Sequence, residues 1–162
     1  MVSRRGRADI QLDGTDVIYR PEPGRDPFGY SKLPERMSRA ELLALTAESD
    51  YPDAPLQVAQ VFDSPRAGDF IVSAVPGYDL RVRNERVEHR SCHGSLHREH
   101  MRVPFAINRP IAARQPRTVD VFNTILRHMG EAALPGLQSQ RPGDSAQHRG
   151  ALLVDGRDLT DV

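Results

Sequence analysis

The chain has 162 residues and no formal net charge at pH 7, because 22 Lys and Arg balance 22 Asp and Glu. This length suffices for one domain with a modest core, and the balanced charge excludes a general attraction to nucleic acid duplexes or anionic membranes. The single cysteine, Cys92, excludes an intramolecular disulfide and a cysteine-cage zinc site. Neither a signal peptide nor a run of about eighteen apolar residues is visible, so we expect a soluble, cytoplasmic chain.

The first third of the chain predicts short elements separated by loops. Residues 1–13 are polar and are expected to be frayed, and residues 16–20 form a short strand that ends at a Pro- and Gly-rich loop. Ser38 and Glu41 fit a capping box at the start of a helix that continues to about Ala47. We therefore divide the chain into a loop-rich segment 1–37 and an α/β portion 38–134.

The α/β portion should contain another helix and the best strand of the chain. Apolar residues at spacing three predict a helix over 54–62. Residues 70–75 are apolar except for Ser73 and rich in β-branched side chains, which is typical of a strand buried on both faces of a parallel sheet. Residues 81–102 have weak periodicity and predict a long loop, a kind of segment that is often functional.

Towards the carboxyl terminus we expect an edge strand over 101–107, because Pro104 is tolerated at such a strand. A helix should begin at Thr118 or Asp120 and end before Gly130, which occupies the position of a C′ glycine. Its apolar residues Val121, Phe122, Ile125, Leu126 and Met129 share one face and should pack in the core. Residues 135–162 should be a mobile tail with a short extended piece at 152–156, and the alternation of strands and helices indicates an α/β fold.

Four of the six histidines lie between His89 and His100. Neutral imidazole is a good ligand for Zn²⁺, and His89, His93, His97 and His100 could form a local zinc site, although Gly94 disfavours a continuous helix there. The block is also basic: residues 81–102 carry six arginines and three acids, whereas residues 38–80 carry two arginines and seven acids. Such a block is typical of a site for an anionic substrate or of a solvated basic loop.

Three motifs together resemble the carboxyl-terminal part of the alkaline phosphatase superfamily, in particular its phosphodiesterase and nucleotide pyrophosphatase branch. They are His93-Gly94 after a strand and a loop, the stretch MRVPF at 101–105, and the stretch RTVDVFNTIL at 117–126. The stretch VDGRDL at 154–159 is similar to the ending that often follows the last of these motifs. The resemblance implies part of an alkaline-phosphatase-like layered sheet with flanking helices.

The resemblance also implies the chemistry of a metal-dependent phosphate-ester hydrolase, acting on a phosphate-ester small molecule or a nucleotide. His93 would be a ligand of a divalent metal, with Zn²⁺ favoured, in a centre where two metals clamp a phosphoryl group. His97 and His100 would either support the ligands by hydrogen bonds or lie on the surface as ordinary polar residues. Arg98 and Arg102 would favour the approach of phosphate.

The chain departs from this family in two ways. Asn123 stands where the family usually has proline, and the upstream nucleophile and Asp-His ligands are absent from these 162 residues. We therefore expect a single partial domain, 1–162, that is inactive alone and has the missing upstream half of the enzyme as its partner. A non-catalytic module that binds phosphate groups or a partner stays open as the alternative.

Overall fold

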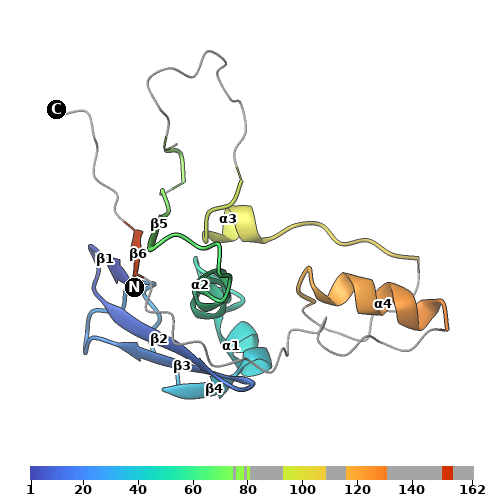
Figure 1. Ribbon diagram of the computed structural model, residues 1–162, viewed down its shortest axis with the longest axis horizontal. Helices are drawn as coiled ribbons and strands as arrows, with labels where there is room; N and C mark the ends of the chain where they lie inside the picture. Colours follow the sequence, from blue (N-terminus) through green and yellow to red (C-terminus); the bar gives the residue numbers. More distant parts are fainter. Residues whose placement is uncertain (75, 79, 81–92, 109–115, 131–150, 155–162) are drawn as a thin grey trace, which may run out of the picture.

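The computed structural model describes residues 1–74, 76–78, 80, 93–108 and 116–130, and the backbone of a strand at 151–154. Mixed helices and strands make up this part of the chain, which confirms the α/β class (Figure 1). The strands are β1 (Val2–Ser3), β2 (Ala8–Asp13), β3 (Asp16–Pro21), β4 (Arg36–Ser38), β5 (Phe70–Val72) and β6 (Ala151–Val154). The helices are α1 (Arg39–Thr46), α2 (Ala54–Phe62), α3 (Arg98–Met101) and α4 (Asp120–His128).

The larger sheet is antiparallel, with strand order β2-β3-β4. The prediction of a strand at 16–20 is confirmed by β3, but the expectation that residues 1–13 are frayed is wrong. Strand β2 turns alternate residues toward the core, with Ala8 buried and Ile10 and Leu12 packed against it. The amino-terminal ammonium of Met1 donates to the carbonyl of Ala8 at 2.8 Å, which ties down the start of the chain.

The smaller sheet is parallel, with strand order β1-β6-β5. Strand β5 confirms the predicted position and direction of the strand at 70–75, but it is three residues long and is not buried on both faces. Phe70 is 67% exposed and Val72 is 43% exposed. Strand β6 confirms extended structure at 152–154, while residues 135–150 and 155–162 lie outside the described part of the chain.

Helices α1 and α2 lie where the sequence predicts them and contact the antiparallel sheet (Figure 1). The hydroxyl of Ser38 accepts the backbone N–H of Glu41 at 3.2 Å, so the predicted N-cap of α1 is present. Helix α2 has proline in its first turn, where the missing N–H costs no hydrogen bond.

The described part of the chain has its hydrophobic core within residues 1–62. Its fully buried members, Val17, Leu42, Ala54 and Leu56, come from β3, α1 and α2. A group of aromatic rings extends this core, since Phe28 lies between Tyr19, Tyr30 and Tyr51 at centroid distances of 5.5–6.2 Å. Residues 1–62 therefore form the part of the chain with a buried core, which we call the folded body, and later segments contact it.

The stretch predicted as an edge strand at 101–107 is not a strand. Met101 ends the short helix α3, and residues 102–107 form no ladder. Alternation of apolar residues favours a strand only where a partner strand is available, and the described residues offer none beside this segment. Helix α4 confirms the last predicted helix, and Gly130 has the positive φ of 83° expected of a C′ glycine.

Buried Tyr19 and partly buried Tyr30 should make the fold sensitive to alkaline pH. Burial is the main reason that the pKa values of Tyr19 and Tyr30 lie far above the ordinary value, and the Asp26 carboxylate raises both further. The unfolded chain releases these protons first, so the free energy of unfolding should be unaffected by them below about pH 9 and should fall above about pH 10. Urea titrations across this range should show a smaller loss for Tyr19→Phe; an identical pH dependence would contradict the assignment.

Candidate functional site

His93 is solvent-exposed at the start of the described segment 93–108. The next residue, Gly94, has a φ of 95°, a backbone conformation that strongly favours glycine. The His-Gly pair therefore has a structural reason for its glycine, because the positive φ favours a residue without a Cβ atom. His89, Arg90 and Cys92, which belong to the same sequence block, lie outside the described residues.

His97 and His100 both support the local backbone around α3. Nδ1 of His97 accepts the N–H of Glu99 at 3.4 Å and so caps the helix, and Nδ1 of His100 accepts the N–H of Ser95 at 3.3 Å. The ring of His97 also packs edge-on against Tyr51, with centroids 5.7 Å apart. In this arrangement one nitrogen of each ring is engaged with the backbone, and the two imidazoles do not converge on His93 to form a ligand set.

Arg98 and Arg102 attach the same segment to the acidic turn between α1 and α2. The backbone N–H of Arg98 donates to the carbonyl of Asp50 at 2.8 Å, and its guanidinium lies 3.6 Å from the Asp50 carboxylate. Arg102 pairs with Glu48 at 3.0 Å and donates to the carbonyl of Ala47. Both arginines that the sequence assigned to phosphate approach are thus paired with carboxylates on the folded body.

No group of three or more His, Cys, Asp or Glu side chains is placed to hold a metal ion within the described residues. His93 is therefore one candidate ligand, and a complete coordination shell would need donors from elsewhere. The hypothesis of a local zinc site formed with His89, His97 and His100 depends partly on a residue outside the described ranges.

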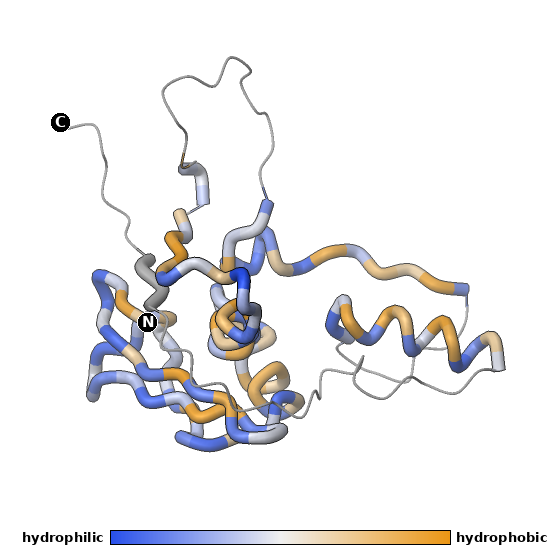
Figure 2. Tube along the Cα trace, viewed as in Figure 1, coloured by the Kyte–Doolittle hydropathy of each residue, from blue (hydrophilic) through white to orange (hydrophobic). Residues whose placement is uncertain are grey.

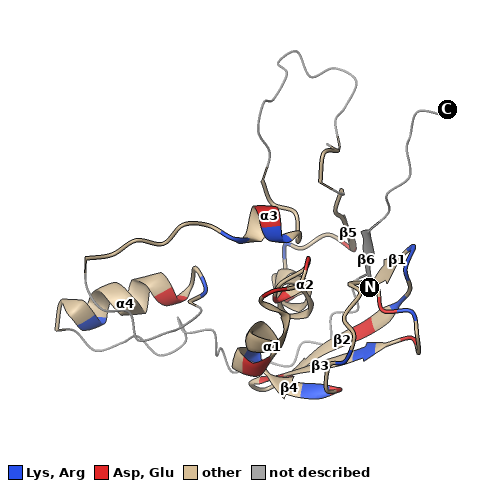
Figure 3. Ribbon diagram, turned by 180° about the vertical axis from the view of Figure 1, so that it is seen from behind, with Lys and Arg blue, Asp and Glu red and all other residues tan. Residues whose placement is uncertain are grey.

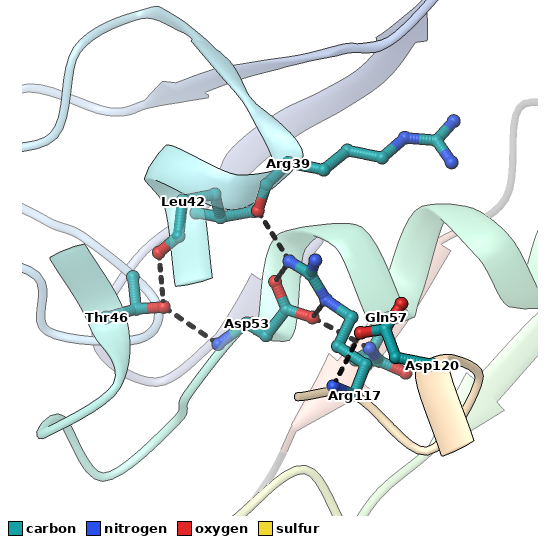
Figure 4. Close-up of polar contacts among 7 residues, drawn as sticks. All are labelled: Arg39, Leu42, Thr46, Asp53, Gln57, Arg117 and Asp120. Atoms are coloured by element: carbon teal, nitrogen blue, oxygen red, sulfur yellow. Dashed lines mark hydrogen bonds and ion pairs between the residues drawn. The ribbon is translucent and has the colours of Figure 1, made fainter. Parts of the chain in front are cut away.

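A buried ion pair joins the segment before α4 to the folded body, and no sequence pattern predicted it. The guanidinium of Arg117 binds the carboxylate of Asp53 with two contacts of 2.7 Å, and their side chains are 11% and 4% exposed (Figure 4). Gln57 donates to the same carboxylate at 2.9 Å, and Arg117 also donates to the carbonyl of Arg39. Residues 64 positions apart therefore meet in a pair that periodicity could not reveal.

The backbone conformation at Asp53 is fixed by hydrogen bonds to the end of α1. Asp53 has a left-handed φ of 59°, and its N–H donates to the hydroxyl of Thr46 at 2.8 Å, which in turn donates to the carbonyl of Leu42 at 2.7 Å (Figure 4). Asp120 is a first-turn acid of α4, as predicted, and its carboxylate accepts the N–H of Arg117 at 2.9 Å. This network positions the start of α4.

Helix α4 presents its apolar face to solvent, so the prediction that this face packs in the core is wrong. Asn123 and Thr124 are buried, whereas Phe122 is 48% and Met129 is 71% exposed. Figure 2 shows hydrophobic stretches along α4 and along the segment after α3, apart from α1 and α2. We define the carboxyl-terminal apolar surface as the exposed large apolar residues after position 69: Phe70, Val72, Tyr78, Leu80, Val103, Val119, Phe122, Ile125 and Met129.

Comparisons with known proteins add no family to this description: no family model, no curated protein and no solved structure matches the chain. Within the described residues, no helix is both long enough and apolar enough to cross a membrane.

Proposed function

We propose that the segment 70–130 supplies the His93 ligand of a divalent-metal centre in a phosphate-ester hydrolase, and that the remaining ligands and the nucleophile come from another polypeptide segment. The observation that carries the proposal is the placement of His93: its side chain is exposed, while the residues that follow it are fixed to the folded body. The motifs that resemble the phosphodiesterase branch of the alkaline phosphatase superfamily are the reason for proposing metal-dependent hydrolysis of a phosphate ester.

The carboxyl-terminal apolar surface supports the second half of the proposal. Parallel sheets normally have both faces covered, and amphipathic helices normally bury their apolar face, yet β5 and α4 both expose theirs. β5 and α4 lie in different parts of the fold (Figure 1), so they offer two separate exposed apolar faces, each of the kind that marks an interaction site. A polypeptide that extends the β1-β6-β5 sheet and packs on α4 would cover this surface, in the layered arrangement that the resemblance implies.

The residues of this chain would have limited and definable roles in the reaction. When bound, the metals supply charge that stabilises the transferring phosphoryl group. His93 would hold one of them through a neutral ring nitrogen. Arg98 and Arg102 would fix the His93 segment through Asp50 and Glu48.

The isolated chain should bind Zn²⁺ weakly, because one imidazole cannot form a coordination shell. In an NMR titration with Zn²⁺, the imidazole signals of His93 should shift first, and His93→Ala should abolish that response while His128→Ala leaves it intact. Stoichiometric, tight binding that is lost in His97→Ala would instead favour the local histidine site.

The hydrolase assignment is tested by restoring the missing segment. The chain alone should not hydrolyse a bis-nitrophenyl phosphate. Co-expression with the polypeptide encoded by the adjacent upstream DNA should give chelator-sensitive hydrolysis, and His93→Ala should lower this activity by at least about 100-fold. Robust metal-dependent turnover by the purified chain alone would refute the partial-site proposal, and the absence of turnover in the co-expressed pair would refute the hydrolase assignment.

A further inference from the structure

Two neighbouring turns at one end of the molecule carry four arginines and one acid. They are residues 3–7, with Arg4, Arg5 and Arg7, and residues 22–25, with Glu22 and Arg25. We call these residues the arginine tip. Blue segments mark it beside β1 in Figure 3. The four arginine side chains belong to exposed residues.

The two turns are held in direct contact, and both close contacts involve an arginine. A Cβ atom on Gly6 would lie 1.6 Å from the carbonyl oxygen of Arg25, so no other residue fits there without displacing the second turn. A Cβ atom on Gly29 would lie 2.9 Å from a terminal nitrogen of the Arg5 guanidinium. The N–H of Glu22 donates to the carbonyl of Arg7 at 2.8 Å. These contacts make the spacing of the turns a fixed property of the fold.

Three of these arginines differ from their neighbours on the same sheet in having no carboxylate partner. Arg20 pairs with Glu35 at 2.6 Å, and Arg36 pairs with Asp16 at 3.0 Å. Among the described residues, by contrast, no carboxylate lies within ion-pair distance of Arg5, Arg7 or Arg25.

Asp26, the residue after Arg25, has another role. One carboxylate oxygen of Asp26 accepts the hydroxyl of Tyr19 at 2.9 Å and the backbone N–H groups of Phe28 and Gly29 at 2.8 and 2.9 Å. Asp26 therefore organises the turn that follows the tip. The guanidinium groups of Arg5, Arg7 and Arg25 are left to anions from solution.

We propose that the arginine tip binds a linear chain of phosphates, either free polyphosphate or the triphosphate part of a nucleotide. Guanidinium groups bind phosphate oxygens through charge-assisted, often bidentate hydrogen bonds. Residues 3–7 and 22–25 contain no aromatic side chain on which a base could stack, so recognition should rest on the phosphates. The chain has no net charge, so any such binding must be local. This proposal does not depend on His93.

The test uses the full chain and inorganic tripolyphosphate at low ionic strength, followed by calorimetry and by amide NMR. We expect saturable shifts centred on residues 3–7 and 22–25 that weaken as salt is added. The triple variant Arg5→Ser/Arg7→Ser/Arg25→Ser should bind at least about tenfold more weakly.

The matched control Arg20→Ser/Arg36→Ser/Arg66→Ser removes the same formal charge and should bind within about twofold of the unchanged chain. His93→Ala should also bind normally, which separates this site from the proposed metal ligand.

Equal affinity for tripolyphosphate and a nucleoside triphosphate assigns recognition to the phosphate chain itself. Tighter binding of the nucleotide assigns recognition to the triphosphate of a nucleotide. Equal losses in the two triple variants, the absence of saturable binding, or binding of a single-stranded oligonucleotide but not of tripolyphosphate would overturn the proposal. Thermal unfolding of both triple variants confirms that each is folded.

Discussion

Replacing Arg117 with alanine should lower the free energy of unfolding by about 3–5 kcal/mol, the loss typical of removing one partner from a buried ion pair. The substitution leaves the Asp53 carboxylate, whose side chain is 4% exposed, with the Gln57 amide as its remaining side-chain donor. Urea unfolding followed by circular dichroism measures the effect, and α4 amides should lose hydrogen-exchange protection in the same variant.

The control for this prediction is Arg98→Ala, which removes an exposed ion pair with Asp50 at 3.6 Å. Exposed pairs contribute less than about 1 kcal/mol, so the two variants should differ clearly. Asp53→Gly should cost about 1 kcal/mol less than Asp53→Ala, because glycine adopts the left-handed φ of 59° without strain. Equal losses for Arg117→Ala and Arg98→Ala would show that the Asp53 pair is not buried in solution.

Leu56→Ala should destabilise the chain by about 3–5 kcal/mol, because it opens a cavity in the core formed by residues 1–62. Leu56 is fully buried, with 0% exposure. Ile125→Ala should cost less than about 1 kcal/mol, since Ile125 is 45% exposed on the apolar face of α4. Denaturant midpoints at a constant m-value measure both changes.

The comparison of these two variants also tests the carboxyl-terminal apolar surface. If Ile125→Ala costs as much as Leu56→Ala, the face of α4 is already covered in the free chain, and the apolar-surface support for a missing partner polypeptide is lost. If the cost appears only after the partner is co-expressed, α4 lies in the interface that the proposed function requires.

Local signals located α1, α2, β3 and α4 because each is fixed by contacts a few residues apart. Ser38 caps the N–H of Glu41, and Gly130 ends α4 with a positive φ. Strand β2 was missed although its sequence alternates apolar Ala8, Ile10 and Leu12 with polar residues, a pattern typical of a half-buried strand, and pairing with β3 stabilises it.

In the candidate site, too, some features could be predicted from the sequence and others could not. The sequence singled out His93 and its glycine, and the φ of 95° at Gly94 gives that pair a structural basis. The roles of Arg98 and Arg102 could not be predicted, because their carboxylate partners, Asp50 and Glu48, are about fifty positions away along the chain. The same holds for Arg117, whose partner Asp53 lies 64 positions earlier.

The sequence by itself determined the positions of α1, α2 and α4 and the α/β class, because periodicity and capping are properties of short stretches. Only the tertiary structure decided which arginines are paired, which apolar faces are exposed and which turns touch. These outcomes depend on contacts between distant residues, such as Asp53 with Arg117 and Gly6 with Arg25, and a one-dimensional pattern carries no measure of that proximity.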